Sequence, residues 1–250
     1  MIGFLRGAVL VLMLIPTMAA AEDLQAGLAA EKAGDFRKAL RELTPLAEAG
    51  NADAQFSLGH MHDFGNGVPQ NYFEAAKWYR LAAEQGNADA QFNLGYLYDH
   101  GFGVPKDYVE ALTWTRLAAD QGIADAENNL GSMYGTGQGV PRDYVESVKW
   151  HRLAAQQGNE VAQLTLAMIY ETGIGVSQDY VESVKWYRMA AKMGNGFAQS
   201  KLGAAYAIGK GAPKDYMATY MWYNIARRLI PLSPGARDVV SGVAARQMFL

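Results

Sequence analysis

Tryptophan recurs along the chain at a fixed interval of 36 residues, and this period constrains the fold more than any other feature. A tyrosine column and a leucine column keep the same interval. Self-similarity at a period of roughly 20 to 50 residues is typical of repeat proteins, in which each unit buries its apolar face against its neighbours. The chain is therefore expected to be a stack of repeats, with the aromatic columns in the core between helices. The three columns are Trp78, Trp114, Trp150, Trp186 and Trp222; Tyr72, Tyr108, Tyr144, Tyr180 and Tyr216; and Leu58, Leu94, Leu130, Leu166 and Leu202.

One period of the sequence predicts two helices joined by a turn. Residues 88–99 carry apolar side chains at helical spacing, and residues 101–105 read Gly-Phe-Gly-Val-Pro, a turn signal. Asp107 is expected to be the N-cap of the second helix, with Glu110 completing a variant of the capping box. Gly122 ends that helix, because glycine readily adopts the left-handed conformation common after a helix. Glycines beside the repeating leucine are expected to admit a closely packed helix: Gly59, Gly95, Gly131 and Gly203.

The combined pattern resembles a known repeat family. Its parts are Ala-x-x-x-Leu-Gly-x-x-Tyr, Gly-x-Gly-Val-x-x-Asp-Tyr and Trp-x-x-x-Ala-Ala-x-x-Gly, and together they resemble the Sel-one-like repeat, a relative of the tetratricopeptide repeat. The departures are Ala167 for glycine, Ile123 for asparagine and Ala212 for valine. The resemblance implies an all-α fold, a right-handed α-solenoid of helix-turn-helix repeats with a curved binding surface. Known members mostly serve as adaptors, scaffolds or host-contact proteins.

The two ends of the chain differ from the repeats. Residues 1–21 combine Arg6, a short apolar run and small residues before Glu22, which is the form of a cleavable secretory signal peptide. The alternatives are a buried N-terminal helix and an uncleaved anchor. We expect a capping helix pair at residues 22–51, five Sel-one-like repeats of 36 residues at 52–230, and a capping helix at 231–250. Capping helices keep a terminal repeat from exposing a core surface.

Composition narrows the compartment and the partners. The signal peptide predicts a periplasmic or secreted protein without a stable membrane anchor after cleavage. The chain has no cysteine, which excludes lipoprotein attachment, disulfides and thiolate metal sites. A net charge of −3 gives no electrostatic footprint for nucleic acid.

No catalytic, metal or cofactor-binding residues are expected. His62 and His151 occupy tyrosine columns and are interpreted as core substitutions. The Gly-x-Gly turns recur in every repeat and lack the lysine and hydroxyl residue of a phosphate-binding loop. Four glutamates, one to a repeat, are interpreted as part of the helix caps: Glu74, Glu110, Glu146 and Glu182.

Some repeat positions on the first helices change residue type from one repeat to the next, and these positions predict a binding surface. Residues spaced 3 and 4 apart there fall within about 60° of helical arc and vary widely in chemistry. A chemically mixed stripe without a packing role is the expected form of a solenoid's binding groove, and the alternative is ordinary solvated surface. The residues of this partner-binding stripe are Ser57, His60, Phe64, Asn93, Tyr96, His100, Asn129, Ser132, Thr136, Thr165, Met168, Thr172 and Lys201.

Together these features predict an exported, non-enzymatic scaffold or adaptor that binds an unidentified protein or peptide in its concave groove. The alternative is a binder of an envelope polymer, a cell-envelope glycan or peptidoglycan. A β-lactam-type hydrolase is a third and less favoured function. Cysteine-rich relatives have been linked with β-lactams, but this chain lacks their cysteines and any Ser-x-x-Lys motif.

Overall fold

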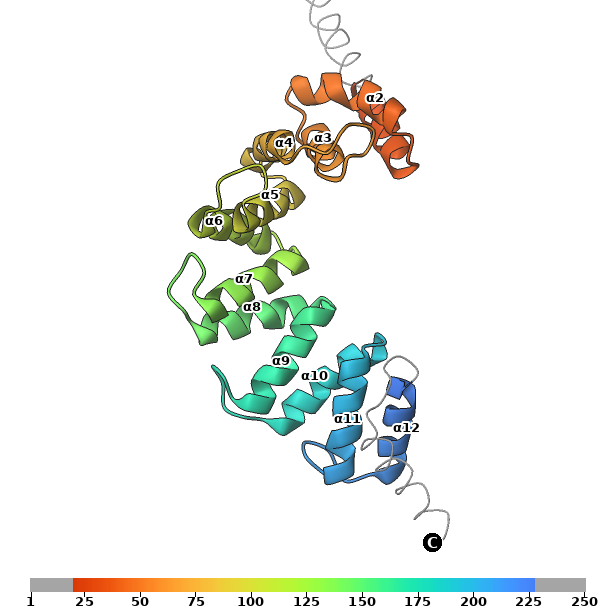
Figure 1. Cartoon of the computed structure of the whole chain (residues 1–250), viewed down its shortest axis with the longest axis vertical. Helices are drawn as coiled ribbons and strands as arrows, with labels where there is room; N and C mark the ends of the chain where they lie inside the picture. Colours follow the sequence, from red (N-terminus) through yellow and green to blue (C-terminus); the bar gives the residue numbers. More distant parts are fainter. Residues whose placement is uncertain (1–19, 228–250) are drawn as a thin grey trace, which may run out of the picture. The chain divides into compact units, whose positions relative to one another are not determined.

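Every regular element within residues 20–227, the part of the chain that the computed structural model describes, is an α-helix (Figure 1). This confirms the all-α class and the helix-turn-helix repeat. The predicted signal peptide lies almost wholly, and the predicted C-terminal capping helix wholly, outside the described residues. After a helical segment at residues 20–32, the helices are α2 Phe36–Glu48, α3 Ala52–Phe64, α4 Tyr72–Glu84, α5 Ala88–His100, α6 Tyr108–Asp120, α7 Ala124–Thr136, α8 Tyr144–Gln156, α9 Glu160–Thr172, α10 Tyr180–Lys192, α11 Gly196–Ile208 and α12 Tyr216–Arg227.

The chain divides into two compact units, and the division falls at a repeat boundary in the sequence. Unit 1 is Met1–Ile123 and unit 2 is Ala124–Leu250. From α2 to α6 in unit 1, and from α7 to α12 in unit 2, consecutive helices pack against each other. Each unit is therefore a helical-repeat stack of the solenoid type. None of the described helices is both long enough and apolar enough to cross a bilayer.

Asparagine and aspartate start the helices at matching places in the repeat. Asn87 precedes α5, and its side chain accepts a hydrogen bond from the Ala90 N–H. Asp107 precedes α6 and accepts from the N–H groups of Val109 and Glu110. Such side-chain acceptors stabilise a helix by about 1 kcal/mol each. Ile123 stands where other repeats have the asparagine cap, and its side chain contains no acceptor.

The prediction that Glu110 completes a capping box with Asp107 is wrong. The Asp107 N–H donates to the Tyr98 carbonyl at 3.0 Å, so it is not available to the Glu110 carboxylate. Glu110 instead accepts from the Trp114 indole at 3.0 Å. The other three glutamates each lie beside a lysine one helical turn later, in the exposed pairs Glu74–Lys77, Glu146–Lys149 and Glu182–Lys185.

Close packing of the two helices within a repeat confirms the role of the helical glycines. A Cβ atom at Gly59 would lie 2.6 Å from the Tyr79 ring, and one at Gly131 would lie 2.9 Å from the His151 ring. His151 is fully enclosed there, as expected of a core substitution, and burial lowers its pKa to about 4. The tryptophan column is less uniform than expected. Trp186 is 4% exposed, whereas Trp78, Trp114, Trp150 and Trp222 are only half-buried.

Hydrogen bonds from a buried glutamine column join consecutive repeats. The Gln91 amide donates to the Ala83 carbonyl near the end of the preceding helix, and Gln121 donates to the Gln91 side-chain oxygen. Gln55, Gln163 and Gln199 make the same bond to the alanine eight residues earlier. Glu127 occupies this column in the third repeat, and an ionised carboxylate cannot donate. The column therefore carries one polar substitution that the repeat pattern does not require.

Within each unit, the second glycine of a Gly-x-Gly turn lies against the start of the preceding second helix. Gly103 has φ +67°, and a Cβ there would lie 2.2 Å from the Tyr72 carbonyl. Gly211 has φ +75°, and a Cβ there would lie 2.0 Å from the Tyr180 carbonyl oxygen. These two turns thus bring backbone against backbone, and their middle residues, Phe102 and Lys210, lie beside Tyr72 and Tyr180.

Candidate functional site

The predicted partner-binding stripe lies on the first helices, but its residues differ in exposure. Seven of them are exposed, namely Phe64, Tyr96, His100, Ser132, Thr136, Met168 and Thr172. Five more are half-buried: His60, Asn93, Asn129, Thr165 and Lys201. Unit 1 contributes the stripe residues up to His100 and unit 2 contributes those from Asn129, so each part is a surface of its own unit.

Ser57 is a correction to the predicted stripe. Its side chain is 2% exposed, which is incompatible with a position free of packing. The cause is the helix at residues 20–32, whose Glu31 side chain interacts with Ser57 and lies 3.2 Å from His60 Nδ1. Burial alone would raise the pKa of Glu31, but hydrogen bonds from His60 and Ser57 lower it below its usual value. The first repeat therefore uses part of its stripe to hold the N-terminal helix.

In unit 1 the stripe becomes an aromatic cluster. The Tyr96 and His100 rings stack at 4.1 Å, one helical turn apart on α5. Phe102 stacks on His100 at 5.4 Å and on Tyr72 at 5.1 Å, joining α5 to the start of α4. Phe102 was missed as a site residue because it belongs to the turn rather than to the helix. Its signal was a large apolar residue between two glycines, and it remains 37% exposed.

Hydroxyl side chains on α7 and α9 of unit 2 bond back to their own helices. The Thr136 hydroxyl donates to the Ser132 carbonyl, and Thr165 and Thr172 donate to carbonyls four residues earlier. Such internal bonds use the hydroxyl hydrogen, which is then not available to a partner. Met168, 48% exposed, lies among them. This part of the stripe therefore offers apolar contact more than hydrogen-bond donors.

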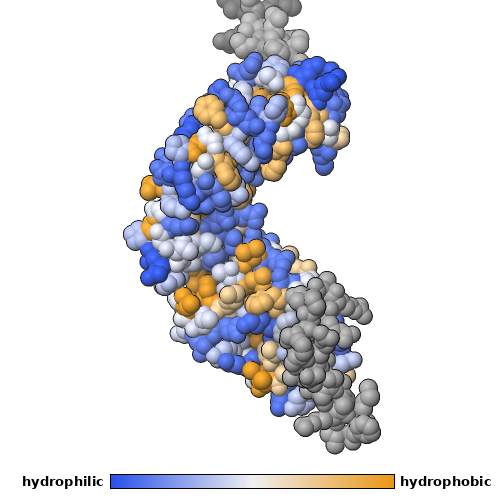
Figure 2. All heavy atoms as spheres, in the orientation of Figure 1, coloured by the Kyte–Doolittle hydropathy of each residue, from blue (hydrophilic) through white to orange (hydrophobic). Residues whose placement is uncertain are grey.

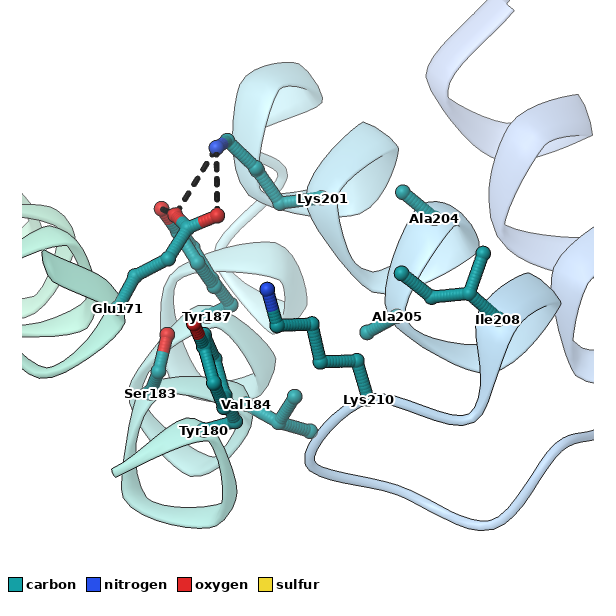
Figure 3. A pocket seen from close by; sticks show the side chains of 10 residues that line it. All are labelled: Glu171, Tyr180, Ser183, Val184, Tyr187, Lys201, Ala204, Ala205, Ile208 and Lys210. Carbon is teal, nitrogen blue, oxygen red and sulfur yellow. Dashed lines mark hydrogen bonds and ion pairs between the residues drawn. The ribbon is translucent and has the colours of Figure 1, made fainter. Parts of the chain in front are cut away.

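A small cavity of about 120 Å³ ends the stripe in unit 2 (Figure 3). Lys201 on α11 reaches both carboxylate oxygens of Glu171, at 3.0 and 2.9 Å. Tyr187 on α10 donates to Glu171 at 2.7 Å. Lys210, in the turn after α11, lies 3.9 Å from the centre of the Tyr180 ring. Ile208 on the opposite wall is 68% exposed.

The charged groups of this cavity are the Glu171–Lys201 ion pair and a further cation, Lys210. Burial alone would raise the pKa of Glu171, but hydrogen bonds from Lys201 and Tyr187 and the charges of Lys201 and Lys210 lower it. Burial, followed by the Glu171 carboxylate, raises the pKa of Tyr187, so this hydroxyl acts as a donor at neutral pH. Glu171 therefore stays ionised, and Lys210 leaves an excess of positive charge beside an apolar wall.

The stripe presents exposed apolar and aromatic side chains in both units. Among the residues that the structure describes, no three histidine, aspartate or glutamate side chains are grouped so that they could hold a metal ion. His100 stacks on Tyr96, His60 lies tilted against the Phe64 ring at 4.6 Å, and His151 is enclosed in the core.

Comparison with known proteins agrees with the repeat geometry. The Sel1 repeat pattern matches residues 52–87, 88–123, 124–159, 161–195 and 196–229. The chain belongs to the Sel1 repeat family. Sel1 repeat proteins generally act as scaffolds for protein–protein interaction. No curated protein matches the chain.

Two solved Sel1-type structures have the same fold over most of the chain. One is a protective antigen of uropathogenic Escherichia coli with an SLR fold, at 32% identity and TM-score 0.84 over 92% of this chain. The match covers 50% of that antigen, so this chain spans about half its length. The other is a Sel1 repeat protein from Oxalobacter formigenes, at 36% identity and TM-score 0.78, with 88% and 90% of the two chains covered. Pseudomonas aeruginosa pilF, at 18% identity and TM-score 0.62, shares the helical fold alone.

Proposed function

We propose that this Sel1 repeat protein is an exported, non-enzymatic scaffold that binds a protein or peptide along its first helices. The observation that carries the proposal is the exposure of large apolar side chains on the partner-binding stripe of both units. Phe64 is 61% exposed, Tyr96 43% and Met168 48%. Interfaces are enriched in aromatic residues and methionine at their centres, and contiguous apolar surface on a soluble protein commonly marks a binding site.

Export rests on the form of residues 1–21, and its test is direct. Cell fractionation and mass spectrometry of the intact protein should recover a mature chain that begins at Glu22 in the periplasm or the medium. A full-length chain that retains Met1 and remains with the cytoplasm would contradict this part of the proposal while leaving the stripe untouched.

Binding is tested by crosslinking in cells followed by recovery of the protein. We expect a defined protein to be recovered with the wild type and lost when Tyr96 and Met168 are both changed to serine. Both side chains are largely exposed, so these changes should move the free energy of unfolding by less than about 0.5 kcal/mol. Glu84→Ser, at an exposed position off the stripe, is the matched control.

If the double serine variant recovers the same protein as the wild type and the Glu84→Ser control, the stripe is ordinary solvated surface. A large drop in melting temperature on Tyr96→Ser would show that this ring packs in the core, contrary to its exposure.

Glycan binding is a second candidate, favoured by the stacked rings of Tyr96, His100 and Phe102. Exposed aromatic faces also suit the apolar faces of sugars. Binding to purified sacculi or exopolysaccharide without any protein, with loss on Tyr96→Ser, would favour this function over the scaffold.

A further inference from the structure

A second apolar surface lies on the second helix of each repeat, and its residues stay apolar from repeat to repeat. The residue after the column tyrosine is apolar in all five repeats, yet its side chain is 61–67% exposed each time. The residues are Phe73, Val109, Val145, Val181 and Met217, and we call them the outer column. Neither burial nor helix capping explains an apolar side chain at these positions. The side chains are exposed, and the helix cap needs only the preceding aspartate or asparagine.

A second apolar position accompanies the outer column two turns later on the same helix. It is leucine in the first three repeats, 39–44% exposed at Leu81, Leu117 and Leu153, and Ile225 in the last is 38% exposed. Positions i, i+4 and i+8 fall within about 80° of helical arc, so the two apolar positions flank one strip of surface. Apolar patches interrupt the hydrophilic surface of both units in Figure 2.

In unit 1 this strip borders a cavity of about 300 Å³. Phe73, Ala76 and Leu81 of α4 form one side, and Gly103 and Val104 of the turn before α6 form the other. This volume is at the small end of ligand pockets and fits one or two large apolar side chains. The cavity exists because Gly103 brings its turn against the α4 backbone beside Phe73.

Two cations complete the wall, and no carboxylate lines the cavity. Lys77 and Arg80 lie one and two turns after Phe73 on α4. Arg80 donates to the Tyr98 hydroxyl and lies over the Tyr98 ring, so its position is fixed before any ligand arrives. The Lys77 side chain is 59% exposed and contacts Glu74 at 3.5 Å, a weak pair that leaves the ammonium group available.

We propose that this outer cavity is a docking site for an extended peptide that inserts an apolar side chain between α4 and the Gly103–Val104 turn. An acidic residue of the peptide pairs with Lys77 and Arg80. The site uses second helices and a turn, whereas the partner-binding stripe uses first helices, so the chain can hold two partners at once and act as an adaptor.

Two other occupants fit the surface less well. A lipid bilayer would meet the exposed tips of the outer column but would leave the recessed space beside Phe73 unfilled, and the chain's net charge of −3 opposes anionic lipid. A second copy of the chain would have to offer an acidic apolar segment at the cations. The helices that carry the outer column instead have lysines four residues after it, at Lys77, Lys149 and Lys185.

The test uses the full mature chain and short fluorescein-labelled peptides in two pools. One pool combines Phe and Leu with Asp and Glu, and the other replaces the acids with Lys. We expect fluorescence anisotropy to show binding of the acidic pool, weakened at high salt, and at least tenfold weaker binding after Phe73→Ser with Lys77→Gln.

Phe64→Ser is the matched control, since it removes the same side chain at almost the same exposure, 61% against 63%, from the partner-binding stripe of the same unit. Acidic-pool binding that survives Phe64→Ser supports the outer site even if the stripe proposal fails. The outer site is overturned if neither pool binds, if both bind equally, or if Phe64→Ser weakens binding as much. It is also overturned if Phe73→Ser instead abolishes binding to phosphatidylglycerol vesicles or dimerisation in sedimentation velocity.

Discussion

Units 1 and 2 place different chemistry on the same repeat positions. The middle residue of the Gly-x-Gly turn is Phe102 in unit 1 and Lys210 in unit 2, and both lie against the tyrosine that starts the preceding second helix. The last residue of the first helix and the residue four places before it also differ. They are His100 and Tyr96 on α5 of unit 1, and Ile208 and Ala204 on α11 of unit 2. Apart from Ile123, Glu127 and Ala167, the glycines, the helix caps and the glutamines keep their places in both units. The scaffold therefore fixes where a side chain stands and leaves its chemistry free to change.

The largest expected effect comes from comparing one tryptophan of each unit. Trp186 of unit 2 is 4% exposed, whereas Trp114 of unit 1 is half-buried and its indole N–H already has a partner in Glu110. Trp186→Ala should lower the free energy of unfolding by about 3–5 kcal/mol, and Trp114→Ala by about 2 kcal/mol. Urea unfolding followed by circular dichroism measures both, and equal losses would show that exposure does not separate the two positions.

The turn glycines should instead respond alike in both units. Gly103→Ala and Gly211→Ala each place a methyl group within about 2 Å of backbone atoms at positive φ. Overpacking and backbone strain together should cost about 3 kcal/mol in each unit. Gly86→Ala is the control, because its φ is +90° but nothing lies within 4 Å, so only the strain of about 1 kcal/mol remains. A loss no larger at Gly103 than at Gly86 would mean that neighbouring repeats do not meet at this turn.

Much of this fold follows from the sequence because its causes are local or periodic. Trp78 to Trp222 fixed the repeat length, and Asn87, Asp107 and Gly122 gave the ends of helices, since caps need only neighbouring residues. The burial of Ser57 could not be read from its column, because only the first repeat lies under Glu31. Phe102 joined the aromatic cluster through a contact between repeats, which a helical-wheel argument on one helix does not contain.

The smallest expected effect comes from exchanging the buried residues Gln91 of unit 1 and Glu127 of unit 2. Gln91 donates to Ala83 and accepts from Gln121; Glu127 accepts from Gln157 at 2.8 Å but cannot donate while ionised. Burial raises the pKa of Glu127, so the folded state binds its proton more tightly than the unfolded state does. The carboxyl group therefore favours folding most at low pH, and that contribution is lost as pH rises through the folded-state pKa.

Glu127→Gln should consequently stabilise the protein by about 1 kcal/mol at neutral pH. The gain should shrink as pH falls through the raised folded-state pKa of the wild-type carboxyl. Gln91→Glu should do the reverse, destabilising by at least as much at neutral pH and less in acid. Thermal unfolding of both variants at neutral and mildly acidic pH measures the two changes in stability. Destabilisation by Glu127→Gln at neutral pH would contradict this prediction. It would mean that a cation stabilises the Glu127 carboxylate, and that the missing donor at this position does not explain the difference between Gln91 and Glu127.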